Sequence, residues 1–175
     1  MYRYSFVIGD ITKINTEAIV NSANTMMVKG SGICKSIFEA AGEKELTKES
    51  VRYAPLEEGQ AIVTNAYNLP CKYIIHTVTP KYYINIGSRK NIEKLSLCYA
   101  SILKRSNELK LKEFAIPCIG VGHHAWPLEL SVNICFDTIE YVLENHPEYS
   151  IENIIFVCVN EKQRYCYYDR AMKHG

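Results

Sequence analysis

The stretch that decides the fold is residues 18–42, which read AIVNSANTMMVKGSGICKSIFEAAG. Residues 18–21 are an apolar run closed by an asparagine, a pattern that predicts a buried β-strand. From Gly32 onward, apolar residues recur at helical spacing, and Gly42 stands where a helix C-cap is expected. The stretch therefore predicts a strand, a glycine-containing loop and a helix in direct succession.

The rest of the chain repeats this alternation of strands and helices. Further strands are predicted at residues 2–8, 60–66, 73–78, 114–119 and 151–159, and further helices at 43–54, 88–109, 127–145 and 160–173. Such alternation is typical of an α/β fold in which helices cover both faces of a largely parallel sheet. We expect a three-layer α/β/α sandwich with a mixed, mostly parallel sheet, formed by residues 1–175 as one domain, and we expect any antiparallel pairing at the opening strand.

Composition and charge restrict the possible partners. The chain has 175 residues, 47% of them hydrophobic, with 20 Lys+Arg against 19 Asp+Glu and a formal net charge of +1. This balance disfavours nucleic acid or an anionic membrane as a partner bound through the field of the whole molecule. No apolar run reaches the ~18–20 residues that span a bilayer, and the N-terminus lacks a secretory signal pattern. We expect a cytoplasmic protein that holds any anionic ligand in a local site.

The cysteines and histidines argue against a metal site. The seven cysteines are odd in number, form no C-x-x-C pair and mostly lie in apolar stretches, which favours buried reduced thiols. Of the five histidines only His123 and His124 are adjacent, and they lack thiol or carboxylate partners at metal-ligand spacing. We therefore expect no metal and no cofactor.

Two glycine loops are candidates for anion binding. Gly30-Ser31-Gly32 opens directly into a helix, where free backbone N–H groups and the helix dipole favour a phosphate. Gly120-Val121-Gly122 follows a strand and can turn its amides inward as a nest. Neither loop matches the P-loop or the full dinucleotide pattern. Two such loops at one strand-end crevice suggest a diphosphate held from both sides, although glycines at strand ends also serve only as turn formers.

Several polar side chains fall at the same strand ends. Asp10 can accept a hydrogen bond from an exocyclic amine or cap its own turn, and spacing alone favours the turn. Asn24 can hold a ribose hydroxyl or fix loop geometry. Cys34 lies just inside a helix N-terminus, a place that lowers a thiol pKa, or is a small packed side chain. His76, within a buried strand, is expected to close a buried hydrogen bond.

Taken in order, these segments resemble the macrodomain, a module that binds ADP-ribose. The residues that carry the resemblance are Gly9-Asp10-Ile11-Thr12, residues 18–24, Gly30-Ser31-Gly32-Ile33, Ile37, Ala40-Ala41-Gly42, Gly59-Gln60-Ala61, residues 74–78, Ile116-Pro117, Gly120, Gly122 and Trp126-Pro127-Leu128. The resemblance runs from about residue 3 to 172, and a chain of motifs in this order is far more specific than any one of them.

The resemblance implies a role for each matching position. Asp10 would hold the adenine amine, with the backbone amide of Ile11 at the same ring, and Asn24 would bind the distal ribose. The first phosphate loop would comprise Gly30, Ser31, Gly32 and Ile33, and the second Gly120, Val121, Gly122, His123, His124 and Ala125. After the last strand, Val159 or Asn160 would face the adenine.

The sequence departs from the hydrolytic MacroD type at the positions that matter for catalysis. Cys34 occupies the position of the catalytic aspartate, and His124 replaces an aromatic residue that covers the distal ribose. A histidine has a pKa of about 6.5, so His124 or His123 could act as the general base that the missing aspartate cannot supply. Cys34 could attack instead, and Asn24 would position a water. Trp126, before Pro127, is expected to pack beside the loop.

We therefore expect a protein that binds ADP-ribose and hydrolyses an ADP-ribose conjugate, either a mono-ADP-ribosyl modification or O-acetyl-ADP-ribose. ADP-ribosylated macromolecules are the other expected partners. Two alternatives stay open at this point. One is a non-catalytic ADP-ribose sensor, which the replacement of aspartate by Cys34 favours, and the other is a phosphatase acting on the 1″-phosphate of ADP-ribose.

Overall fold

The computed structural model describes residues 1–82 and 88–173. Its strands are β1 (Arg3–Ile8), β2 (Ala18–Ala23), β3 (Ala61–Asn65), β4 (Tyr73–Val78), β5 (Glu113–Pro117) and β6 (Asn153–Cys158). Its helices are α1 (Gly32–Ala41), α2 (Glu43–Ser50), α3 (Ser88–Glu108), α4 (Leu128–Asn145) and α5 (Glu161–Lys173), with short 3₁₀ turns η1 (Ile11–Lys13) and η2 (Val51–Tyr53). Each strand and helix predicted from the sequence is present, within a few residues at its ends.

The six strands form one mixed sheet in the order β1-β6-β5-β2-β4-β3. All neighbours are parallel except β3 and β4, which pair antiparallel through a short connection that leaves no room for a crossover helix. The expectation of antiparallel pairing at the opening strand is therefore wrong. Strand β1 runs parallel to β6, from Arg3 opposite Asn153 to Ile8 opposite Cys158.

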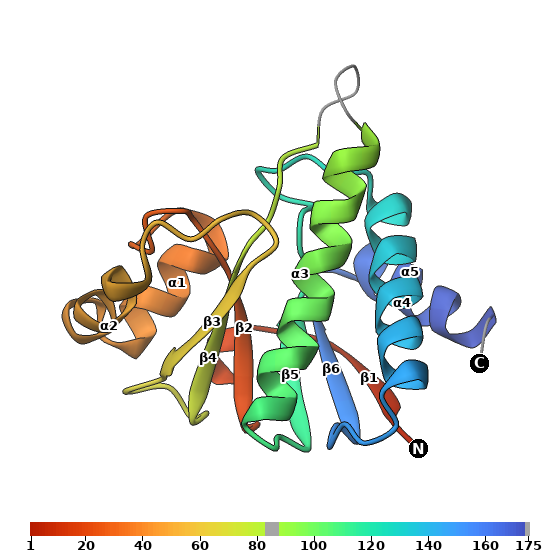
Figure 1. The fold of residues 1–175 in the computed structure, drawn as a ribbon, viewed down its shortest axis with the longest axis horizontal. Helices are drawn as coiled ribbons and strands as arrows, with labels where there is room; N and C mark the ends of the chain where they lie inside the picture. Colours follow the sequence, from red (N-terminus) through yellow and green to blue (C-terminus); the bar gives the residue numbers. More distant parts are fainter. Residues whose placement is uncertain (83–87, 174–175) are drawn as a thin grey trace.

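Helices cover both faces of the sheet, as expected for a three-layer sandwich. Helices α3, α4 and α5 pack on one face, where Phe156 of β6 meets Phe136 of α4 and Tyr167 of α5. Helices α1 and α2 pack on the other face, where Val157 belongs to the same apolar cluster as Ile37 of α1. Neighbouring residues of β6 thus face opposite layers, as the two-residue period of a strand requires. Figure 1 shows α3 and α4 side by side in front of the sheet.

The parallel strands end at one edge of the sheet, the upper edge in Figure 1. Because β2, β5 and β6 all end there, the loops after them open at the same edge. These loops carry residues 24–31, 118–127 and 159–160, which include both glycine loops. Among the described residues, no helix combines the length and the apolar character needed to cross a membrane.

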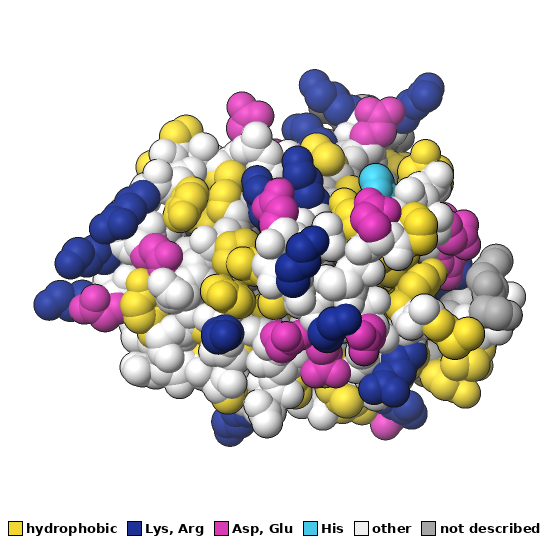
Figure 2. Space-filling model, turned by 60° about the horizontal axis from the view of Figure 1, so that its bottom comes forward, with side chains coloured by type: hydrophobic (Ala, Val, Ile, Leu, Met, Phe, Trp, Pro, Cys, Tyr) yellow, Lys and Arg dark blue, Asp and Glu magenta, His cyan; other side chains and the backbone are white. Residues whose placement is uncertain are grey.

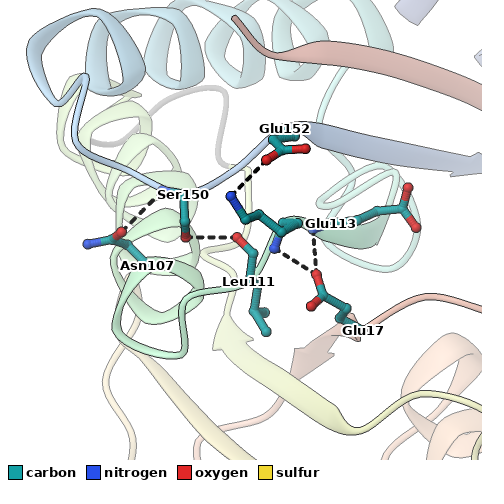
Figure 3. A network of polar contacts seen from close by, with 7 residues as sticks. Glu17, Asn107, Leu111, Glu113, Ser150 and Glu152 are labelled. Atoms are coloured by element: carbon teal, nitrogen blue, oxygen red, sulfur yellow. Dashed lines mark hydrogen bonds and ion pairs between the residues drawn. The ribbon is translucent and has the colours of Figure 1, made fainter.

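At the opposite edge, Glu17 links three strands. Its backbone carbonyl accepts hydrogen bonds from the amides of Lys72 and Tyr73 at the start of β4, at 3.0 and 3.3 Å. Its carboxylate Oε2 accepts from the amides of Lys112 and Glu113 at the start of β5, at 2.6 and 2.8 Å (Figure 3). Acidic and basic side chains are interspersed over this edge (Figure 2). Glu17 therefore joins β2 to both of its neighbours.

Replacing Glu17 with alanine should lower the free energy of unfolding by about 1–2 kcal/mol, because two strand-end amides lose a charged acceptor. Glu17→Gln keeps an oxygen that can accept both bonds and serves as the matched control, with a smaller loss expected. Urea unfolding followed by circular dichroism measures both. Equal losses in the two variants would show that the carboxyl-to-amide contacts contribute nothing.

Candidate functional site

A cleft with a volume of about 460 Å³ opens at the carboxyl edge of the sheet. Its lining residues come from the end of β2, the first glycine loop, the start of α1, the end of β5 and the second glycine loop. They are Ser22, Ala23, Asn24, Gly30, Ser31, Gly32, Ile33, Cys34, Pro117, Cys118, Gly120, Gly122, His123 and His124. The two loops that the sequence singled out thus border one cavity of a size typical of small-molecule sites.

The first glycine loop is held by Asn24. The side-chain Nδ2 of Asn24 donates to the carbonyl of Val28 at 2.7 Å, and Oδ1 accepts from the Val28 amide at 3.3 Å. Gly30 lies so close that a Cβ there would stand 3.2 Å from Asn24 Nδ2, and Gly32 takes a left-handed φ of +57°. In this structure the Asn24 amide therefore shapes the loop that lines the cleft.

The second glycine loop is held by Trp126. The Trp126 amide donates to the carbonyl of Gly120 at 2.9 Å, and the indole Nε1 donates to the carbonyl of Pro80 at 2.7 Å. Gly120 has a φ of +87°, and a Cβ at this residue would lie 2.9 Å from Cδ1 of Trp126. The buried indole thus packs beside the loop, as predicted, and its contact with residue 120 requires glycine there.

His124 and His123 both line the cleft but differ in their surroundings. His123 is exposed, whereas His124 is half-buried and its carbonyl accepts from the Tyr82 amide at 2.8 Å. Nδ1 of His124 is buried and has no hydrogen-bond partner within residues 1–82 and 88–173. No protein group in the described ranges thus competes for this nitrogen, although a ligand in the cleft reaches it only if the ring turns.

Cys34 lies at the cleft as the outer member of a buried polar chain. Its Sγ lies 3.7 Å from Nδ2 of Asn21 and 3.8 Å from the carbonyl of Val28. The same Asn21 Nδ2 contacts Nδ1 of His76 at 3.0 Å, and Nε2 of His76 lies 2.9 Å from Oγ1 of Thr64. His76 is therefore a buried histidine with a hydrogen-bond partner at each ring nitrogen, as the sequence predicted.

Burial sets the direction of the pKa shifts of Cys34 and His76 in this network. The Cys34 side chain is only 6% exposed, and its burial raises the thiol pKa, although hydrogen bonding from Asn21 opposes the rise. The lowered pKa expected for a thiol inside a helix N-terminus is therefore wrong, because desolvation outweighs the helix end. Desolvation also lowers the pKa of His76 to about 3, so His76 is neutral near pH 7.

The remaining predicted ligand residues do not line the cleft. Asp10 is exposed, and its Oδ1 caps η1 by accepting from the amide and hydroxyl of Thr12 at 2.9 and 2.7 Å, which lowers the Asp10 pKa. Ile11 is buried against the α1 layer. The Asn160 side chain accepts from the Gln163 amide at 2.9 Å and so caps α5.

Val121 and Ala125 belong to the second glycine loop. Ala125 takes a φ of +58°, and its amide donates to the Gly122 carbonyl at 3.0 Å, closing a turn. Neither residue lines the cavity.

The sequence reasoning missed Ser22, Ala23, Pro117 and Cys118 as lining residues. Their only signal was position, since each lies at the carboxyl end of a predicted strand, where ligands bind in parallel sheets. Within the described ranges, no group of three or more His, Cys, Asp or Glu side chains could hold a metal ion.

The contact between residue 120 and Trp126 can be tested with two matched glycine-to-alanine variants of the same loop. Gly120→Ala should lower the free energy of unfolding by about 2–4 kcal/mol, because it combines a left-handed φ with a clash against a buried indole. Gly122→Ala, in the same loop, meets nothing within 4 Å and should change stability by less than about 0.5 kcal/mol. Denaturant unfolding compares the two, and equal losses would refute the requirement for glycine at 120.

His76 predicts a pH dependence of stability. Its folded-state pKa lies below the ordinary 6.5, so its stabilising contribution is complete above pH 6.5 and is lost as pH falls toward about 3. In that window the wild-type free energy of unfolding should fall more steeply than that of His76→Gln, by about 1.4 kcal/mol per pH unit. Parallel pH curves for the two proteins would contradict the assignment.

Known proteins are similar to this chain over the residues that line the cleft. A family model described as Macro domain matches residues 20–135. A protein of Fusobacterium nucleatum is 39% identical over 166 residues, which cover 94% of this chain and 92% of that protein. The mouse ADP-ribose glycohydrolase MACROD2 is 42% identical over 154 residues, covering 86% of this chain but only 31% of MACROD2, so the chain spans about a third of that relative.

Solved structures agree with this comparison. A mutant of the Oceanobacillus iheyensis macrodomain with ADPR has a TM-score of 0.88 and 30% identity, covering 97% of this chain and 91% of that one. The Trypanosoma brucei macrodomain in complex with ADP-ribose has a TM-score of 0.85 and 26% identity, covering 96% of this chain and 68% of that one. The chain therefore belongs to the macro domain family.

Proposed function

We propose that this chain binds ADP-ribose in the cleft between its two glycine loops and hydrolyses an ADP-ribose conjugate. The observation that carries the proposal is that residues 30–34 line one cavity with residues far away in sequence, namely Pro117, Cys118, Gly120, Gly122, His123 and His124. Support comes from a macrodomain with ADPR whose fold is the same over 97% of this chain, and from relatives named ADP-ribose glycohydrolase.

The proposed binding mode places the pyrophosphate between the two loops. Backbone amides of Gly30, Ser31, Gly32 and Ile33 at the start of α1, and those of residues 120–125, would donate to the phosphate oxygens. Formal charge on this chain is nearly balanced, so the amides and the helix dipole supply the local attraction.

At the adenosine end, Asp10 and the Ile11 amide would contact the adenine, with Asn160 beside it. Both bonds from Thr12 go to Oδ1 of Asp10, so the exposed Oδ2 can accept from an exocyclic amine. The side chain of Asn160 caps α5 in this structure and would have to turn, or contact the ligand through its backbone.

At the distal ribose, Asn24 and His124 would act on the reacting end of the ligand. Asn24 lines the cleft and would share its amide between the Val28 backbone and a ribose hydroxyl or a water. His124 would serve as general base, because its imidazole lines the cleft and its Nδ1 has no competing partner among the described residues. The buried Nδ1 would have to turn toward the cleft to take the proton from a water that attacks the anomeric carbon or an ester carbonyl. His123, exposed at the same wall, is the second candidate base.

Cys34 is less suited to catalysis than its position implies. A nucleophilic thiol needs a lowered pKa or an adjacent base, whereas burial raises the pKa of Cys34 and its contacts are an amide and a carbonyl. The neutral thiol at this position also favours the alternative function, a sensor that binds ADP-ribose or an ADP-ribosylated macromolecule without turnover.

Calorimetry and a hydrolysis assay separate these functions. We expect ADP-ribose to bind with a Kd in the micromolar range, near −8 kcal/mol. With O-acetyl-ADP-ribose or mono-ADP-ribosylated protein, His124→Ala should lower the rate of ADP-ribose release by about 10²–10⁴-fold. His146→Ala, which removes an exposed histidine paired with Glu148, is the control and should leave the rate unchanged.

Binding without product in the wild-type protein would establish the sensor. Equal rates for wild type and His124→Ala would remove His124 from the mechanism and leave His123 to be tested. Absence of ADP-ribose binding would overturn the proposal as a whole.

A further inference from the structure

Two cysteines meet where strands β5 and β6 end. Cys118 follows β5 directly and Cys158 is the last residue of β6, and the two strands are parallel with Pro117 opposite Val157. The next position in that register therefore places Cys118 beside Cys158, and their sulfur atoms lie 3.8 Å apart. Adjacent strands are about 4.8 Å apart, which is within the Cα separation of about 4.4–6.8 Å that a disulfide requires.

The surroundings differ for the two sulfurs. Cys158 is fully buried, whereas Cys118 is half-buried and borders the cleft. The hydrogen bond from Cys118 lowers the pKa of Cys158, and the nearby Arg164 guanidinium lowers it further, against the effect of burial. The pKa of Cys118 is raised because it holds the proton of this S–H···S contact. A solvent-side sulfur thus stands next to one that loses its proton more readily, the arrangement that favours disulfide formation.

The other cysteines with described surroundings offer no such pair. Among the described residues, Cys118 and Cys158 are the only two cysteines whose sulfur atoms are in contact. Burial also raises the pKa of Cys98, to about 11, and that of Cys135. Cys71, half-buried in the layer of α1, also has a pKa raised by burial.

We propose that Cys118 and Cys158 are a redox modification site, which a hydroperoxide converts reversibly to a disulfide at the edge of the cleft. The inference goes beyond the proposed function, because it concerns the strand ends rather than the ligand.

The reaction takes two steps and consumes one peroxide. Cys158, deprotonated, takes the proton of the S–H···S contact as the sulfur of Cys118 attacks one oxygen of hydrogen peroxide. The O–O bond breaks, and the displaced hydroxide takes a proton from solvent and leaves as water. The sulfur of Cys158 then attacks the sulfenic sulfur of Cys118, the S–O bond breaks, and a second water leaves with the proton of Cys158. Two electrons pass from the thiols to the peroxide, and a dithiol reductant reverses the change.

Peptide mapping of the intact folded protein tests the site. After brief treatment with hydrogen peroxide and alkylation of the remaining thiols, we expect a peptide pair linked through Cys118 and Cys158 as the main product, reversed by dithiothreitol. Cys118→Ser and Cys158→Ser should each abolish this pair, and Cys71→Ser, which removes another half-buried thiol, should leave it unchanged. Circular dichroism checks that each variant is folded.

Two results would overturn the proposal. One is full alkylation of both thiols after peroxide treatment of folded wild-type protein, and the other is oxidation of Cys118 to a sulfinic acid without a cross-link. Both are read from the wild type, so the test stands even where a serine variant fails to fold.

A second readout connects the site to the cleft and rests on the proposed function. ADP-ribose at ten times its Kd leaves about one protein in eleven unliganded, so cross-linking should slow about tenfold if the ligand covers the side from which peroxide reaches Cys118. If ADP-ribose binds but the rate of cross-linking does not change, peroxide reaches the two cysteines by another route. If ADP-ribose does not bind at all, the proposed function fails and the peptide map still decides the disulfide.

Discussion

Strand β2 lies at the centre of the sheet with a parallel neighbour on each side, and this pairing places the site. Ala18, Ile19 and Val20 are at most 1% exposed, so helices must cover both faces of the strand. Because β4 and β5 run in the same direction as β2, residues 24–34 and 117–124 reach the same edge of the sheet. A reversal of β5 relative to β2 would separate the glycine loops by the length of a strand. The cleft thus forms because the strands run in the same direction. Within the loops, glycine is required only where the backbone or a close neighbour leaves no room for a side chain.

Beneath the cleft, the polar chain of Asn21, His76 and Thr64 crosses from β2 through β4 to β3. All three residues are at most 1% exposed, so their hydrogen bonds cannot be exchanged for bonds to water. The chain fixes the relative position of three strands and also sets the direction of the Asn21 amide toward Cys34. A thiol at position 34 suits this environment, since a neutral group is less costly to bury than a charged one.

Much of the fold could be predicted from the sequence because its signals are local. Hydrophobic periodicity located the strands and helices, and Gly42 marked the end of α1, where its amide donates to the Phe38 carbonyl. Pairing partners far apart in sequence gave no such signal, and the parallel contact of β1 with β6 was missed for that reason. In the site, the glycine loops and the histidines were found by residue type and position. The bond from Asn24 to Val28, the burial of Cys34 and the meeting of Cys118 with Cys158 depend on register and loop conformation, which spacing alone does not determine.

The segment after β4 is bonded to the second loop at two points, through the Pro80 carbonyl to the Trp126 indole and through the Tyr82 amide to the His124 carbonyl. His124 therefore owes its place in the cleft to a stretch of chain more than 40 residues earlier in sequence. Three of the four bonding groups are backbone atoms, so the tie depends on the path of the chain after β4 more than on its side chains. An aromatic contact across it, between the ring centroids of Tyr82 and Trp126 at 5.1 Å, makes the indole the shared anchor of both segments.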